Sequence, residues 1–121
     1  AVTAEGGTVT TNLQQGLAKA WISMNGTGTI AVRDSFNITG ITDQGTGLTT
    51  VTIANNMGSA EYSIGGASGT FIDNSDNVRF GLSTDPEAPT STLFRTITRE
   101  ANDDTNRDVT YSFAQVHGDL A

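Results

Sequence analysis

Two turn-rich segments carry the side chains of this sequence best suited to bind a ligand. "DNSDN" covers residues 73–77, and "NDDTNRD" covers residues 102–108. Calcium takes six to eight oxygen ligands, which Asp and Asn can supply, but neither segment contains the glycine and terminal glutamate of the helix-loop-helix calcium pattern. Asp and Asn also favour turns without any ion. We therefore expect surface turns here, with no bound metal and no cofactor.

Covalent and acid–base catalysis lack most of their usual residues. The chain has no cysteine and one histidine, His117, which is close in sequence to Asp119. A general acid or base needs a partner carboxylate or nucleophile held nearby, and no serine stands in the strand–turn–helix context that exposes a nucleophile. A histidine at the end of a final strand is more often a solvated or capping residue. We expect that the protein is not an enzyme.

Trp21 is the only tryptophan, and it lies in "LAKAWISM", residues 17–24. Strand alternation predicts one face with Ala18, Ala20, Ile22 and Met24, and another with Leu17, Lys19, Trp21 and Ser23. The first is the better core face. An indole ring can stack on a sugar, but in a small β-domain a single tryptophan more often lies in the core or in a subunit interface. The pattern predicts that Leu17 and Trp21 form part of a subunit interface.

Short apolar alternations separated by turn signals predict an all-β protein. No segment repeats apolar residues with the period of a helix, whereas "NGTG" (25–28), "TDQGTG" (42–47) and "DPEAP" (85–89) favour turns. The alternation changes phase near Asp34 and Ser35, which predicts either two strands or one strand bent by a bulge. We expect an antiparallel β-sandwich or jelly-roll-like fold of about eight short strands. Residues 1–12 would form an extended N-terminal arm, and residues 13–121 a single domain.

Composition and charge exclude several classes of partner. The 121 residues are 36% hydrophobic and 16% charged, as in a globular protein. The formal net charge is -7, and the six basic residues are scattered, so the concentrated positive field that nucleic acid requires is missing. No window approaches the length of apolar chain that membrane insertion needs. Without cysteine there is no disulfide, so stability must come from the core or from neighbouring subunits.

An ordered series of motifs runs through the first half of the chain. It comprises "AKAW" at 18–21, "NGTGT" at 25–29, "RDSFNI" at 33–38, "ITDQGTG" at 41–47 and "AEYSI" at 60–64. This series resembles a small β module of the virion structural and tail-fibre proteins of tailed bacteriophages, particularly marine ones. The resemblance covers about the first half of the chain. The second half keeps the β pattern without a motif that aligns.

The resemblance implies a component of the phage virion, made in the cytoplasm of the host bacterium. Fibre modules of this kind are usually trimers, so it implies a homo-oligomer that contacts other virion proteins and presents loops to a glycan or protein of the host surface. It implies no catalytic residue. The contact segments are predicted only from the fact that binding residues often lie on surface loops, and they are 42–47, 73–77, 84–90 and 101–107. The candidate contact residues are Asp43, Gln44, Asp73, Asn74, Asp76, Asn77, Asp103, Asp104 and Asn106.

Two other functions remain open. One is a capsid decoration protein that cements subunits and recognises nothing outside the particle. The other is a carbohydrate-binding module, although such a module usually shows more than one exposed aromatic residue. In either phage role we expect the first dozen residues to act as an anchor, because an extended arm of small residues can add as a strand to the sheet edge of a neighbour.

Overall fold

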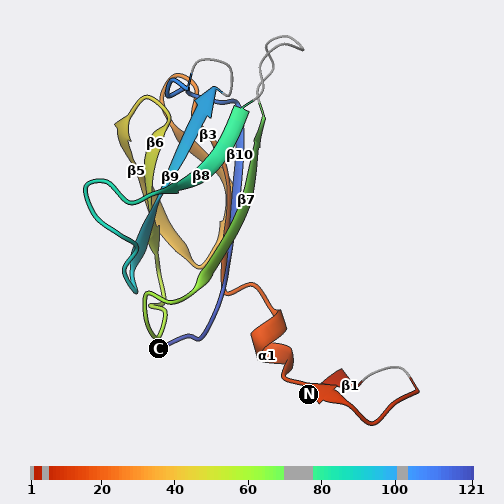
Figure 1. Ribbon diagram of the computed structural model, residues 1–121. Helices are drawn as coiled ribbons and strands as arrows, with labels where there is room; N and C mark the ends of the chain where they lie inside the picture. Colours follow the sequence, from red (N-terminus) through yellow and green to blue (C-terminus); the bar gives the residue numbers. More distant parts are fainter. Residues whose placement is uncertain (1, 4–5, 70–77, 101–103) are drawn as a thin grey trace.

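Two antiparallel four-stranded sheets make up the body of the protein (Figure 1). The computed structural model describes residues 2, 3, 6–69, 78–100 and 104–121. Within these residues the first sheet has the order β4-β3-β10-β7 and the second the order β5-β6-β9-β8. The bounds are β3 Ala20–Asn25, β4 Ala31–Phe36, β5 Ile38–Gly45, β6 Leu48–Ile53, β7 Ser63–Gly69, β8 Val78–Ser83, β9 Leu93–Glu100 and β10 Tyr111–His117. The prediction of an all-β sandwich is confirmed.

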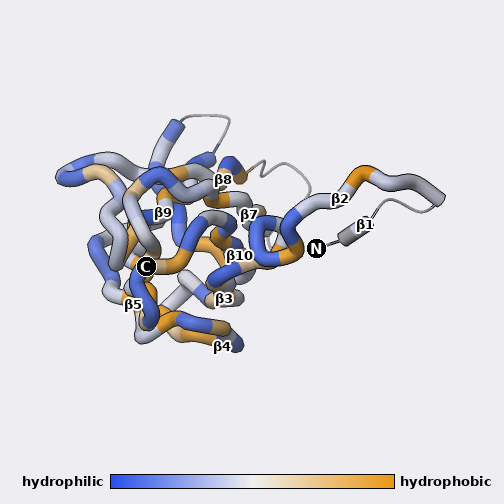
Figure 2. Tube along the Cα trace, turned by 90° about the horizontal axis from the view of Figure 1, so that it is seen from below, coloured by the Kyte–Doolittle hydropathy of each residue, from blue (hydrophilic) through white to orange (hydrophobic). Residues whose placement is uncertain are grey.

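The core lies between the two sheets and follows the strand alternation. In β3, Ala20, Ile22 and Met24 are buried, as the sequence pattern predicts for that face. Their partners come from both layers and are Val51, Ile53, Met57, Phe94, Ala114 and Val116. Figure 2 views the sandwich from below, with β4, β3, β10 and β7 in one layer and β5, β9 and β8 in the other. Apolar burial between these layers is the main stabilising term, since the described chain has no cross-link.

The chain crosses from the first sheet to the second at Asn37, which separates β4 from β5. Its φ of 57° is left-handed, a conformation that asparagine tolerates better than most residues. The Asn37 side chain donates to the carbonyl of Lys19 at 2.9 Å and accepts from the backbone N–H of Asn55 at 2.8 Å. Both alternatives predicted from the change of phase are present: a β-bulge interrupts the pairing of β4 next to Asp34, and the chain divides into two strands in different sheets at Asn37.

The N-terminal residues do not form one extended arm. Val2–Thr3 (β1) pairs with Thr10–Thr11 (β2), and a single helical turn, α1, covers Leu13–Gly16. The turn arises because the Asn12 side chain accepts a hydrogen bond from the N–H of Gln14 at 2.9 Å, as an N-cap does. We call the described residues up to Gly16 the N-terminal segment. It projects away from the sandwich, on the side of the outer face of the first sheet (Figures 1 and 2). No helix of the described residues is long and apolar enough to cross a membrane.

Candidate functional site

The outer face of the first sheet carries exposed aromatic side chains. Trp21 on β3 lies opposite Phe36 on β4, and Phe113 on β10 lies opposite Ser23, two residues along β3. Together with Tyr111 we call Trp21, Phe36 and Phe113 the aromatic band. Their exposed fractions are 38% for Trp21 and Tyr111, 44% for Phe113 and 54% for Phe36. Large apolar side chains that gather on one exposed face are typical of an interaction surface.

Specific contacts hold two rings of the band in place. Tyr111 and Phe113 stack with ring centroids 6.3 Å apart, and the guanidinium of Arg33 lies 4.4 Å from the centroid of Tyr111. Arg33 is the extra residue of a β-bulge, because Asp34 pairs with Ser23 whereas Val32 pairs with Met24. A bulge re-aims a side chain. Here it brings a cation over an aromatic face, which is a favourable arrangement, so this part of the band is ordered before any partner binds.

A shallow depression of about 540 Å³ lies beside Trp21 and Phe113. Residues 65–67 of β7 form its opposite side, and because they are two glycines and an alanine, no large side chain fills the depression there. Ser23 and Gln115 supply polar groups on the same lining. The depression can therefore accept a flat ring or an apolar side chain, with hydrogen-bonding groups close by.

A second hollow, of about 640 Å³, lies where the N-terminal segment joins the sandwich, and we call it the base groove. Leu17, Phe36 and Leu120 are its exposed apolar residues. Phe36 belongs to both the base groove and the aromatic band, so the two predicted interface residues, Leu17 and Trp21, border one continuous apolar surface. Leu17 reaches this surface from the end of α1, not from the strand, because β3 begins only at Ala20.

The predicted contact residues that the structure describes gather at the end of the sandwich opposite the N-terminal segment (Figure 1). Asp43 and Gln44 lie in β5, which continues to Gly45, so the prediction of a turn over residues 42–47 begins too early. Hydrogen bonds link this hairpin to the 104–108 loop, since Asp108 accepts from the N–H of Gly47 at 2.8 Å. Asp73, Asn74, Asp76, Asn77 and Asp103 lie outside the described residues.

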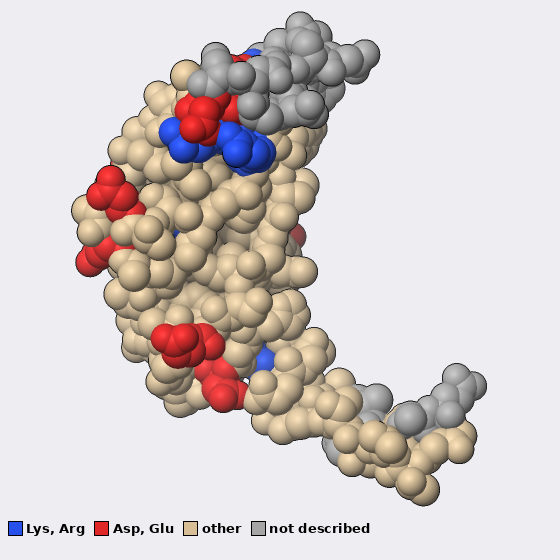
Figure 3. Space-filling model, viewed as in Figure 1, with Lys and Arg blue, Asp and Glu red and all other residues tan. Residues whose placement is uncertain are grey.

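Charged side chains at the same end pair with one another. Asp104 lies 2.5 Å from Arg79 and 3.5 Å from Arg99, and Glu100 pairs with Arg107. Figure 3 shows blue and red atoms side by side in this region. The ion pairs of Asp104 therefore stabilise the loop. Asn106 is exposed, and its backbone forms an isolated β-bridge with Arg99. Among the described residues, no group of three or more His, Asp or Glu side chains is placed to hold a metal ion.

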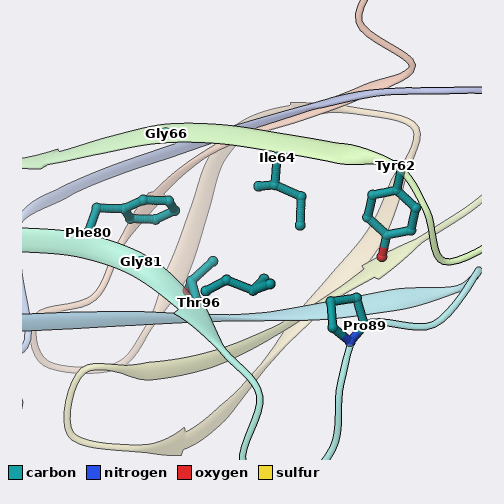
Figure 4. A pocket seen from close by; sticks show the side chains of 8 residues that line it. Tyr62, Ile64, Gly66, Phe80, Gly81, Pro89 and Thr96 are labelled. Carbon is teal, nitrogen blue, oxygen red and sulfur yellow. The ribbon is translucent and has the colours of Figure 1, made fainter.

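A groove of about 290 Å³ opens between β7 and β8, the edge strands of the two sheets (Figure 4). Ile64, Phe80 and Pro89 supply apolar side chains to its lining, and Tyr62 and Thr96 supply polar ones. The Tyr62 hydroxyl donates to the carbonyl oxygen of Thr90 at 2.8 Å and lies 3.0 Å from that of Leu93. Burial raises the pKa of Tyr62 to about 12. The groove can thus accept a small apolar side chain beside the core. Tyr62 itself stabilises the fold, because its hydroxyl is bonded to the backbone of residues 90 and 93.

His117 and Asp119 have separate surroundings. His117 ends β10 and pairs with Ser63 across the sheet, while the Asp119 carboxylate accepts a hydrogen bond from the Gln15 side chain. Asp119 therefore helps to hold the base of the N-terminal segment.

Sequence reasoning identified Trp21 and missed the rest of the aromatic band. A signal for the rest was present, because strict alternation over residues 111–116 places Tyr111 and Phe113 on one face and Ala114 and Val116 on the other. The base groove had none, because it depends on the packing of three distant segments. No protein-family model, curated protein or solved structure matches the chain.

Proposed function

We propose that this chain is a non-catalytic structural module of a tailed-phage particle. It assembles with copies of itself through the outer face of the first sheet, as a trimer, and presents the loops of the opposite end to a host surface. The aromatic band is the observation that carries this proposal. The motif series at residues 18–64 supports the phage assignment.

The size of the band supports assembly. At about 200 Å² of surface for each aromatic residue, the exposed fractions of its four members leave about 350 Å² of aromatic surface in water. Burying this area contributes about 9 kcal/mol at about 25 cal/mol per Å². Association costs about 4–15 kcal/mol in lost freedom of motion. The band alone thus roughly offsets that cost, and further buried surface makes the assembly stable.

The arrangement of the two ends supports presentation of loops. The N-terminal segment leaves one end of the sandwich, and the hairpin with Asp43 and Gln44 and the loop with Asn106 lie at the other (Figure 1). A module anchored by its first residues would therefore hold these polar groups farthest from the particle. Several copies in one assembly would gain avidity for a repeated surface ligand.

A second candidate function, glycan binding, is favoured by the depression beside Trp21. Trp21 and Phe113 offer stacking surfaces, and Ser23 and Gln115 offer hydrogen bonds, which is the combination a pyranose ring requires. The two proposals compete for one surface, because a face that is buried between copies cannot hold a sugar.

Light scattering over a dilution series of the full chain tests the assembly. We expect three times the 12.6 kDa mass of one chain. Trp21→Ser with Phe113→Ser should keep the circular dichroism of the sandwich and give a single-chain mass. Leu82→Ser is the matched control, since Leu82 is 41% exposed on the second sheet. A monomer at every concentration, or an unchanged mass in the double variant, would contradict the proposal.

Binding of the labelled protein to host cells separates the three roles. The attachment role requires binding without the rest of the particle, whereas a decoration protein would show none. Retention on a polysaccharide column that is lost in Trp21→Ala, with mass and fold unchanged, would instead establish the glycan-binding role.

A further inference from the structure

The described residues of the N-terminal segment have no core of their own. Residues 6–16 are all exposed, and Val9 and Leu13 are 75% and 50% exposed. Its hairpin consists of two residue pairs and its helix of four residues. A hairpin or helix this short is marginal in water by itself. The segment therefore needs an apolar surface against which to pack.

The segment's own sandwich does not offer that surface to its apolar residues. The hydrogen bonds that tie the described part of the segment to the sandwich lie at its base, where the Gln15 side chain donates to Asp119 and Lys19 donates to the carbonyl oxygens of Gln14 and Leu17. Beyond this point the segment points outward (Figures 2 and 3). Val9 therefore does not pack against the sandwich of its own chain.

The base groove is an unfilled apolar surface of suitable size. It measures about 640 Å³, and Leu17, Phe36 and Leu120 line it while remaining about half exposed. Through Phe36 it continues into the aromatic band, whose exposed aromatic area of about 350 Å² is below the roughly 800 Å² that each partner buries in a stable interface. Filling the groove would supply much of the missing area. β4, which carries Phe36, is also an edge strand with one side free to pair.

We propose that the N-terminal segment of one copy lies in the base groove of the next copy, with Val9 and Leu13 against Phe36 and Leu120. The inference rests on the proposed assembly through the outer face and adds how neighbours are joined. Each copy supplies one segment and one groove, so the contact is heterologous, and it closes into a ring when the rotation between copies is that of a trimer. The second copy is the occupant because each chain carries one exposed apolar segment and one groove, so the two are present in equal number.

Disulfide trapping in the full chain tests this contact directly, because the protein has no cysteine of its own. One chain carries Val9→Cys, and a second chain with a size tag carries Leu120→Cys. After the two are mixed, refolded and mildly oxidised, we expect a product of the combined mass on a non-reducing gel that disappears on reduction. A disulfide forms only when the two Cα atoms are within about 7 Å. Val9→Cys mixed with tagged Leu82→Cys is the control, since Leu82 lies on the second sheet.

The outcomes separate this inference from the assembly on which it rests. Segment exchange is overturned if light scattering gives a trimer but the Val9–Leu120 disulfide product does not exceed the Leu82 control, and if Phe36→Cys in place of Leu120→Cys gives the same result. The outer-face assembly would then still stand. A monomer overturns both. Deletion of residues 1–12 provides an independent readout, with dissociation expected at concentrations at least about tenfold higher than for the full chain, and an unchanged dilution profile would also overturn the inference.

Discussion

Replacement of Asn37 should destabilise the sandwich although Asn37 is only half-buried and lies outside the core. Its left-handed backbone turns the chain from the first sheet into the second. Its side chain bridges the carbonyl of Lys19 and the N–H of Asn55, and its carbonyl accepts from the N–H of Ala54 at 2.9 Å. One residue therefore ties together the entry to β3, the crossing between sheets and the exit from β6.

Two variants separate the contributions of side chain and backbone. Loss of the side-chain hydrogen bonds with the Lys19 carbonyl and the Asn55 N–H costs about 1 kcal/mol each, and two further exposed bonds to Asn55 are lost equally in both variants. Asn37→Gly loses both bonds and adds about 0.5–1 kcal/mol of chain entropy, for a total of about 2–3 kcal/mol. Asn37→Ala loses the same bonds and adds about 1–2 kcal/mol because a Cβ atom disfavours the left-handed conformation, for a total of about 3–4 kcal/mol. The alanine variant should therefore be the less stable by about 1 kcal/mol.

Urea unfolding measures the difference, followed by circular dichroism and by the fluorescence of Trp21, which lies opposite Phe36 at the end of β4. All chains must be compared at one concentration, because assembly stabilises the folded state by mass action. Equal midpoints for the glycine and alanine variants would refute the role of the left-handed backbone. A loss below about 0.5 kcal/mol in both would refute the role of the hydrogen bonds.

Three further predictions concern tyrosine and glycine. Folding raises the pKa of Tyr62 from 10.0 to about 12, so the unfolded state loses the tyrosine proton first as the pH rises. The free energy of unfolding should therefore fall between about pH 10 and about pH 12. Tyr62→Phe should remove this part of the fall, as measured by urea titrations at several pH values. Gly47→Ala should unfold at much lower urea than Gly28→Ala, since both glycines have φ near 70° but only a Cβ at Gly47 would lie 2.5 Å from the carbonyl oxygen of Thr98. Gly65→Ala should leave the isolated fold intact or slightly stabilised, yet raise the concentration at which the assembly dissociates in light scattering.

Strand alternation and turn chemistry were sufficient to predict most of the fold. In β3 the apolar period of two identified the buried residues, and the "NGTG" turn appears where expected, with the Asn25 side chain accepting from the N–H of Thr27 at 3.0 Å. Boundaries were harder to predict. Polar Asp43 and Gln44 are compatible with a turn by composition, but the strand continues through them because Asp43 and Gly45, on either side of Gln44, pair with β6, and only tertiary context decides this. The helical turn after Asn12 depends on one capping bond, which a period cannot reveal.

The candidate site was predictable only in part, because it is a property of a sheet and not of a strand. Trp21 stood out by its rarity, but its neighbours Phe36 and Phe113 are brought to it by pairing between residues far apart in the sequence. Phe36 looks like one more core residue in the linear pattern. It is exposed because it pairs with Trp21 and shares with it the outer face of the first sheet.

Some glycines of β7 are not required by packing within the chain, and this favours the interpretation that the outer face of the first sheet is shaped to contact a partner. Gly66 has a reason within the chain, since a Cβ there would lie 2.4 Å from the carbonyl oxygen of Phe113 and from the ring of Phe80. Within the part of the chain that the structure describes, Gly65 and Gly69 have no such reason, because a Cβ at either position would meet nothing closer than 3.8 Å. Glycine within a strand costs about 0.5–1 kcal/mol relative to alanine. A sheet that combines such glycines with exposed aromatic residues is suboptimal for an isolated domain, and both features become favourable when the face packs closely against a second copy.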